Sequence, residues 1–151
     1  MAKPDGDGKP RVVQGACLCG AIRFEVDLPT LFCAHCHCSM CRRSHGAAFV
    51  TWFGASPDRV RVTSGQEHLA RHRSSDHATR SFCARCGSSL FFESTRDPDR
   101  IDVVLANMDD PIDRPPQLHV HFDDRVTWAP IHDSLTRLGG ESGLEPLAEG
   151  D

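Results

Sequence analysis

The spacing of the cysteines limits what this chain can fold into more than any other feature. Eight cysteines lie among 151 residues, and they fall into three groups. These are a C-x-C pair at Cys17 and Cys19, a C-x-x-C pair at Cys83 and Cys86, and a central cluster of Cys33, Cys36, Cys38 and Cys41. Thiols at short regular spacings in a reducing compartment are more often metal ligands than disulfide partners. We therefore expect a small zinc protein.

Length and composition are typical of one globular domain, with 39% hydrophobic and 25% charged residues. No apolar stretch could cross a bilayer, and Met1 to Gln14 contains no hydrophobic signal region, so we expect a cytoplasmic protein with no membrane partner. The formal charge of −4 gives no general attraction to nucleic acid. Polar composition predicts flexible tails at residues 1–10 and 139–151, which leaves a domain at residues 11–138.

Alternating apolar and polar residues predict a mainly β fold. The clearest run is Ala21 to Val26. Similar runs occur at Ala47 to Phe53, Arg59 to Thr63, Leu90 to Glu93, Ile101 to Leu105 and Leu118 to Phe122. Only two short segments have helical patterns: Ser39 to His45, with Ser39 able to act as the N-cap and Gly46 as the C-cap, and Pro130 to Leu138.

The two outer cysteine pairs predict one closed zinc site. A C-x-x-C turn places two sulfurs about 3.5–4 Å apart, close to the edge of a tetrahedron whose Zn–S distance is about 2.3 Å. A glycine follows each pair and allows the chain to turn tightly. The simplest four-sulfur site joins the pairs and fastens the two ends of the sheet together. The alternatives are buried reduced thiols, or a redox C-x-x-C, which normally opens a helix rather than a turn between strands.

The central cluster predicts a second metal site. Cys36, Cys38 and Cys41 supply three thiolates, and Cys33 could supply a fourth. With three protein ligands the site would be open to an exchangeable ligand, and with four it would be closed and only structural. The spacing leaves both arrangements open.

Several histidines and arginines could assist this site. His35 and His37 could be outer-shell partners or proton carriers, or ordinary exposed loop residues. His119 and His121 should share one strand face, so His119 is a candidate proton shuttle if that face lines a cavity and part of a polar sheet surface if it does not. Five arginines could bind substrate carboxylates or belong to a solvated face: Arg42, Arg43, Arg71, Arg73 and Arg80.

Four motifs follow one another between residues 11 and 138. The first is G-A-C-L-C-G-A-I-R-F at residues 15–24, and the second is C-H-C-S-M-C-R-R at residues 36–43. The third is R-S-F-C-A-R-C-G-S at residues 80–88, and the chain closes with P-Q-L-H-V at residues 116–120 and Trp128. In this order they resemble the motifs of the glutathione-dependent formaldehyde-activating enzyme (GFA) family.

The resemblance implies a β-tent, zinc-ribbon-like fold of coiled antiparallel sheets with short helical turns. It implies a structural zinc on Cys17, Cys19, Cys83 and Cys86, and a second zinc on Cys36, Cys38 and Cys41. The reaction it implies joins glutathione and formaldehyde into S-hydroxymethylglutathione. Zinc with three thiolates carries a formal charge of −1, so it suits another sulfur ligand better than it suits hydroxide formation.

We therefore expect a zinc-dependent carbon–sulfur lyase or synthase that acts on a small thiol such as glutathione, with Cys36, Cys38 and Cys41 as the catalytic group. The alternative is a non-catalytic zinc module for a protein partner, in which Cys33 closes the second site. A nucleic-acid-binding zinc ribbon would need a basic stripe, and the dense basic positions are limited to Arg42–Arg43 and Arg71–Arg73. We expect no nucleic-acid partner.

Overall fold

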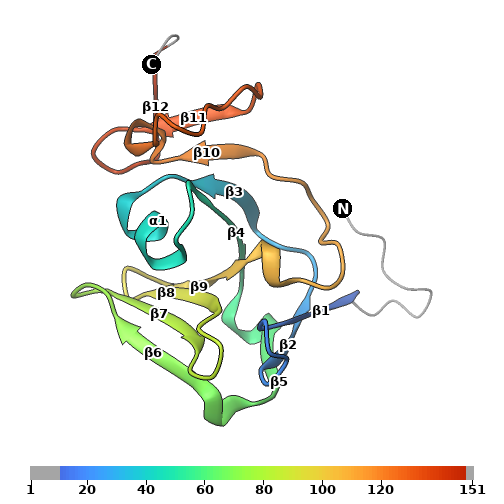
Figure 1. The fold of residues 1–151 in the computed structure, drawn as a ribbon. Helices are drawn as coiled ribbons and strands as arrows, with labels where there is room; N and C mark the ends of the chain where they lie inside the picture. The colour runs from blue at the N-terminus through green and yellow to red at the C-terminus, as the bar shows by residue number, and fades with distance from the viewer. Residues whose placement is uncertain (1–10, 149–151) are drawn as a thin grey trace. The chain divides into compact units, whose positions relative to one another are not determined.

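The structure, a computed structural model, describes residues 11–148. It contains twelve strands in two sheets, one α-helix of seven residues and several short 3₁₀ turns, so the mainly β prediction is confirmed (Figure 1). Within residues 11–148, no helix has both the length and the apolar character needed to cross a membrane.

Contacts between residues divide the chain into two compact units. The first unit contains Phe53–Pro115 together with the part of the chain up to Phe32, and the second contains Cys33–Trp52 together with the part after Pro115. The domain limits expected from composition stay a prediction, and residues 1–10 and 149–151 lie outside the described part.

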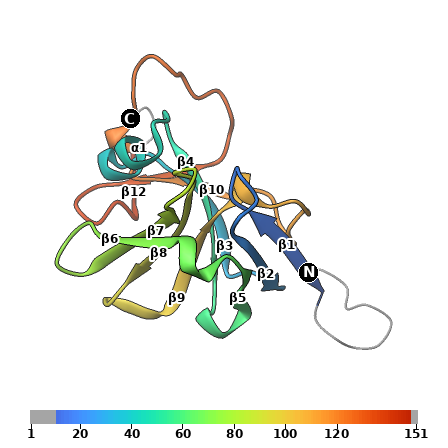
Figure 2. The same cartoon turned by 60° about the horizontal axis from the view of Figure 1, so that its bottom comes forward.

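The first unit includes a three-stranded antiparallel sheet in the order β1-β2-β5. Its strands are β1 (Val12–Ala16), β2 (Arg23–Asp27) and β5 (Val60–Ser64). Val13 lies opposite Val26, and Phe24 lies opposite Val62, so the apolar positions of the alternating pattern share one buried face. Figure 2 shows β1 and β2 running side by side.

The same unit contains four consecutive antiparallel strands in the order β9-β8-β7-β6. They are β6 (Leu69–Arg73), β7 (Ala78–Cys83), β8 (Ser89–Ser94) and β9 (Asp97–Val104), and 3₁₀ turns occur at Pro57–Arg59, Gln66–His68 and Leu105–Asn107. The rings of Phe24 and Phe91 meet edge to face with centroids 5.1 Å apart. This contact packs β2 against β8 in one apolar core.

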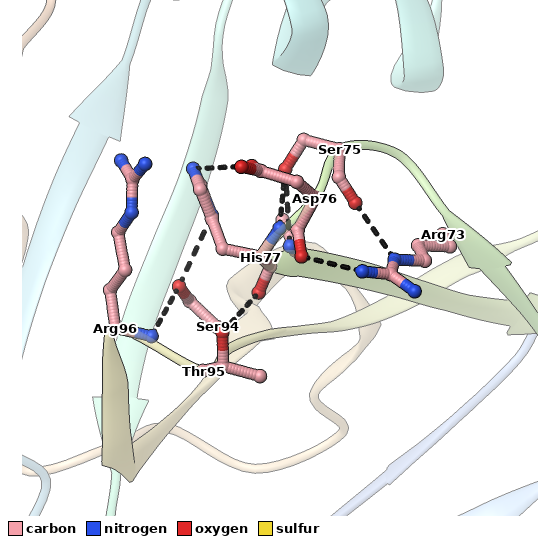
Figure 3. Close-up of polar contacts among 8 residues, drawn as sticks. Arg73, Ser75, Asp76, His77, Ser94, Thr95 and Arg96 are labelled. Carbon is pink, nitrogen blue, oxygen red and sulfur yellow. Dashed lines mark hydrogen bonds and ion pairs between the residues drawn. The ribbon is translucent and has the colours of Figure 1, made fainter.

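The turn between β6 and β7 is held by side chains that bond the backbone, as Figure 3 shows. Arg73 donates from Nε to the carbonyl oxygen of Ser75 at 3.2 Å and from Nη2 to that of Asp76 at 2.7 Å. His77 Nδ1 lies 3.3 Å from the hydroxyl of Ser94, on the neighbouring strand β8. Arg73, one of the arginines considered for substrate carboxylates, therefore stabilises a turn.

Two further arginines from that group have partners within the β6–β9 strands. Arg71 forms an ion pair with Glu93 at 3.6 Å, and the guanidinium of Arg80 lies over the ring of Phe92 at 5.0 Å. Arg80 and Phe92 are directly opposite on neighbouring strands, whereas Arg71 on β6 reaches past β7 to Glu93 on β8.

The second unit contains all or part of five strands in the order β12-β11-β10-β3-β4, and Phe32 of β3 and the last three residues of β4 are assigned to the first unit. They are β3 (Phe32–Cys36), β4 (Val50–Ala55), β10 (Leu118–Val120), β11 (Thr136–Gly139) and β12 (Glu145–Pro146), with a 3₁₀ turn at Phe122–Asp124. Strand β10 runs parallel to both β3 and β11. Because of this pairing, His119 lies directly beside His35.

Helix α1 (Ser39–His45) is confirmed as predicted, and so is its C-cap Gly46, which has φ 60°. The N-cap prediction was wrong by one residue. Cys38 is the N-cap, and its sulfur accepts a hydrogen bond from the backbone N–H of Cys41 at 3.2 Å. A sulfur therefore takes the role that the Ser39 hydroxyl was expected to fill.

The helix expected at Pro130 to Leu138 is absent, and that prediction was wrong. Residues 130–135 have no regular structure, and Thr136–Gly139 forms β11. The side chain of Asp133 accepts a hydrogen bond from the N–H of Leu135 at 3.0 Å. This local bond competes with helix formation, and pairing with β10 then favours a strand.

Candidate metal centres

The first unit brings together the two outer cysteine pairs. The sulfur atoms of Cys17, Cys19, Cys83 and Cys86 all lie within 4.8 Å of one another. The Cys17–Cys19 sulfur distance is 3.6 Å and the Cys19–Cys83 distance is 3.9 Å. A tetrahedron with Zn–S bonds of about 2.3 Å has edges of about 3.8 Å, so the donor set fits a tetrahedral metal ion.

Each pair sits on a turn that only glycine adopts without strain. Gly20 has φ 75° and donates its N–H to the carbonyl of Cys17, and Gly87 has φ 80° and donates to the carbonyl of Cys83. The N–H of Leu18 donates to the Ser88 hydroxyl at 2.9 Å. This bond connects the two turns directly, although their positions in the sequence are far apart.

Backbone N–H groups and a hydroxyl favour thiolate at two of these sulfurs, those of Cys17 and Cys86. The N–H of Ile22 donates to the sulfur of Cys17 at 3.3 Å. The hydroxyl and N–H of Ser88, together with the N–H of Cys19, lower the pKa of Cys86 to about 5. Such donors orient sulfur ligands and stabilise their negative charge, as expected around a metal site.

The second unit brings together Cys36, Cys38 and Cys41, whose sulfurs lie within 4.8 Å of one another. Cys36 ends β3, Cys38 caps helix α1, and Cys41 lies in the first turn of that helix. Cys36 and Cys41 are buried and Cys38 is half-buried. A strand end followed at once by a helix start therefore brings three sulfurs within six consecutive residues to one point.

The three sulfurs cannot all be thiolates at low energetic cost unless a cation is present. Hydrogen bonds from the Cys36 and Cys41 thiols, together with the N–H of Cys41, lower the pKa of Cys38 to about 2. The other two sulfurs and burial raise the pKa of Cys36 well above its ordinary range. Three thiolates so close together repel one another. The donor set therefore fits a thiophilic metal ion, because a cation would stabilise all three charges.

Cys33 is not part of either group. It is fully buried on β3, three residues before Cys36. Successive side chains of a strand point to opposite faces, so residues three apart face opposite ways. Among residues 11–148, the second group consequently has three sulfurs and no fourth.

His37 and His119 are buried, contrary to the exposed readings considered for each. As whole residues they are 1% and 0% exposed, and His37 Nε2 lies 2.8 Å from His119 Nδ1. His119 Nε2 lies 3.0 Å from both carboxylate oxygens of Asp133. Phe122 packs on both imidazoles, with ring centroids 5.1 Å and 5.2 Å away. Of the two alternatives considered for His119, a polar sheet surface is therefore wrong.

His35 lies beside this chain of hydrogen bonds. Its ring centroid is 5.0 Å from that of His119, and its Nδ1 lies 2.8 Å from the hydroxyl of Thr51. Burial, and after it the nearby His119, lowers the pKa of His35. Burial in the same cluster lowers the pKa of His37 to about 4, so both rings are neutral near pH 7.

His121 does not continue the face of His119. Strand β10 ends at Val120, and His121 has φ 50°, in the left-handed region that few residues other than glycine adopt. Its imidazole is close enough to help lower the pKa of Cys38. The break in the strand therefore places His121 toward the three-sulfur group, whereas His119 enters the core.

Of the arginines considered near this group, Arg42 donates from Nε to the carbonyl oxygen of His37 at 3.3 Å. It supports the ligand-bearing segment from within helix α1. Asp133 was missed as a partner of this region, because nothing in the sequence connects it with His119, which lies fourteen positions earlier.

Comparison with known proteins identifies the family of this chain. The model of the glutathione-dependent formaldehyde-activating enzyme family matches residues 12–124. The chain belongs to this family, and the resemblance read from its motifs is confirmed.

Three individual relatives show how close the similarity is. A Halomonas elongata protein named "Putative glutathione-dependent formaldehyde-activating enzyme" is 28% identical over 80% of this chain and 81% of its own. An uncharacterized lyase of Schizosaccharomyces pombe is 34% identical over 54% of this chain, and the match covers 58% of that protein, less than two thirds of it. A crystal structure of a Rhodobacter sphaeroides protein has 30% identity and a TM-score of 0.57, covering 67% of this chain and 92% of that one.

Proposed function

We propose that the chain is a zinc-dependent carbon–sulfur lyase or synthase of the cytoplasm that acts on a small thiol. The reaction we favour joins glutathione and formaldehyde into S-hydroxymethylglutathione. Family membership supports the class of reaction, and the two sulfur groups support the metal. In this proposal Cys17, Cys19, Cys83 and Cys86 hold a structural zinc, and Cys36, Cys38 and Cys41 hold a second one.

The observation that carries the proposal is the difference between the two groups. One has four sulfurs and the other has three among the residues described. Four protein ligands close a tetrahedral site, whereas three leave a position for an exchangeable ligand. Cys33, which could have closed the second site, lies on the strand face away from Cys36.

A zinc ion held by three thiolates would supply a soft binding position for a fourth sulfur and lower the pKa of the incoming thiol. The chain's own residues would hold this geometry. Cys38 is fixed by the N–H of Cys41, and Cys41 is fixed by the first turn of α1. In this proposal His121, which helps to lower the pKa of Cys38, would exchange the thiol proton.

The chemical step balances without any oxidant or reductant. The thiolate sulfur attacks the formaldehyde carbon, a C–S bond forms, and the C=O π pair moves to oxygen, which takes up one proton. The thiol releases one proton and the oxygen takes up one proton, so the protons balance. The reverse reaction breaks the same C–S bond.

The test compares two single-cysteine variants with the wild-type protein. We expect two zinc ions per chain in the wild type and in Cys33→Ser, and one in Cys38→Ser. Glutathione binding should be lost only in Cys38→Ser. Adduct formation, followed by NMR of ¹³C-labelled formaldehyde, should be faster than in buffer for the wild type and Cys33→Ser alone.

Two results would contradict the proposal in different ways. Loss of the second zinc in Cys33→Ser would show that this thiol closes the site, which supports a non-catalytic zinc module. Two zinc ions with no acceleration of adduct formation by any thiol would exclude the reaction while keeping both metal sites.

A further inference from the structure

A chain of hydrogen bonds joins the surface to the segment that carries the three-sulfur group. It begins at Asp133, whose side chain is 41% exposed, and passes through His119 to His37. His37 stands between Cys36 and Cys38 in the sequence. The last residue of the chain is therefore part of the proposed ligand loop itself.

The direction of each hydrogen bond follows from the chemistry of Asp133. The N–H of Leu135 and the His119 imidazole outweigh burial and lower the pKa of Asp133, so it is a carboxylate that can only accept. His119 must then carry its proton on Nε2, which leaves Nδ1 as an acceptor. His37 must donate to it from Nε2, and its own Nδ1 stays unprotonated.

The surroundings of His37 agree with this tautomer. Among the described residues, its Nδ1 is buried and has no hydrogen-bond partner. A buried nitrogen lone pair without a partner is tolerated better than a buried N–H without one. The opposite direction, with His119 donating from Nδ1, would place a proton on His37 Nδ1 with nothing to accept it.

His37 is also anchored through its backbone. Its N–H donates to the carbonyl of Val120 at 3.0 Å, and its carbonyl accepts from Arg42 Nε at 3.3 Å. With the Nε2 bond to His119, three hydrogen bonds fix the residue between two sulfurs. A displacement of His37 as a whole would move the backbone that carries both neighbouring thiols.

We propose that Asp133 is a positioning residue for the second metal site. It fixes the tautomer of His119, His119 fixes the orientation and tautomer of His37, and His37 holds Cys36 and Cys38 at the separation a metal ion needs. Partners of this kind around a metal site commonly change metal affinity about 10-fold to 100-fold. The inference rests on the proposed zinc at Cys36, Cys38 and Cys41.

The test uses Asp133→Ala in the full-length, two-zinc protein. Asp124→Ala is the matched control, because Asp124 is an exposed carboxylate of the same unit whose side chain makes no hydrogen bond or ion pair within residues 11–148. Zinc affinity is measured by competition with a chelator, and the four-sulfur site serves as an internal reference in the same molecule. The tautomers of His37 and His119 are read from ¹⁵N NMR of the imidazole nitrogens.

We expect Asp133→Ala to weaken zinc at the second site about 10-fold to 100-fold, to leave the first site unchanged, and to shift the His119 and His37 nitrogens away from the Nε2–H tautomer. Asp124→Ala should match the wild type in every measurement. Unchanged tautomers, unchanged second-site affinity, or equal weakening at both sites would overturn the inference and leave the proposed function standing. A wild-type protein with one zinc per chain would overturn both.

Discussion

Asp102 provides a quantitative test of the fold, because it is a carboxylate buried in a sheet. It lies on β9, its residue is 8% exposed, and Arg100 Nε approaches its Oδ1 to 3.0 Å. That oxygen accepts no well-aligned hydrogen bond among the described residues, so the ion pair only partly offsets burial. Burial raises the pKa of Asp102 from 3.8 to about 6.

The difference in pKa determines how this residue changes stability with pH. Because the folded pKa is the higher one, the native state binds the proton more tightly and stability falls as pH rises from about 4 to about 6. At about 1.4 kcal/mol for each pKa unit, the full effect is about 3 kcal/mol. About 1.4 kcal/mol of it falls between pH 5 and pH 8, where the cysteine ligands can still hold a metal.

Asp102→Asn is neutral at every pH and should remove this dependence. We expect the free energy of unfolding of Asp102→Asn, relative to the wild type, to rise by about 1.4 kcal/mol between pH 5 and pH 8. Urea denaturation of both proteins at several pH values measures this difference. The pH dependence of metal binding is common to both proteins, so it cancels in the difference. Asp99→Asn, an exposed change on the same strand, is the control. A difference that stays constant with pH would refute the argument.

Three further changes test the metal centres. Cys83→Ser should unfold most of the first unit, because structural zinc contributes about 10–16 kcal/mol in small metal domains; an unchanged melting temperature would contradict a structural site. Cys38→Ser should keep the melting temperature within a few degrees and lose one zinc per chain by metal analysis. Gly87→Ala should cost about 1–2 kcal/mol in urea denaturation, because its φ of 80° is strained for alanine; no loss would show that the turn can relax.

The parts of the fold and site that could be predicted are those fixed by local spacing. C-x-C and C-x-x-C pairs place their own sulfurs together whatever the rest of the chain does, and Gly46 ends helix α1 by its own conformation. Strand β2 was recognised because one face is buried and the other is not. Strand β3 was missed because Cys33 and Ala34, on opposite faces, are both buried and give no alternation.

The sequence does not show which face of a strand will be covered by another segment of the chain. Alternation along β10 separates His119 from its apolar neighbours Leu118 and Val120, but it does not tell which face of the strand is turned to the core. The core contains His119 because Asp133 and His37, from separate segments, satisfy both of its nitrogens. An imidazole with both nitrogens bonded can be buried at little cost, and only the folded chain reveals the partners.

The two sulfur groups should also differ in what they contribute to stability. Cys19 and Cys83 are 64 residues apart, so a metal ion between them closes a long loop, whereas Cys36 and Cys41 are five residues apart. Loop closure entropy grows with the logarithm of loop length, which gives the first group an advantage of about 2 kcal/mol from chain entropy alone. A cross-link within one short segment constrains the unfolded chain little. The second site can therefore exchange a ligand with little effect on the fold, which is the property that a reactive metal centre requires.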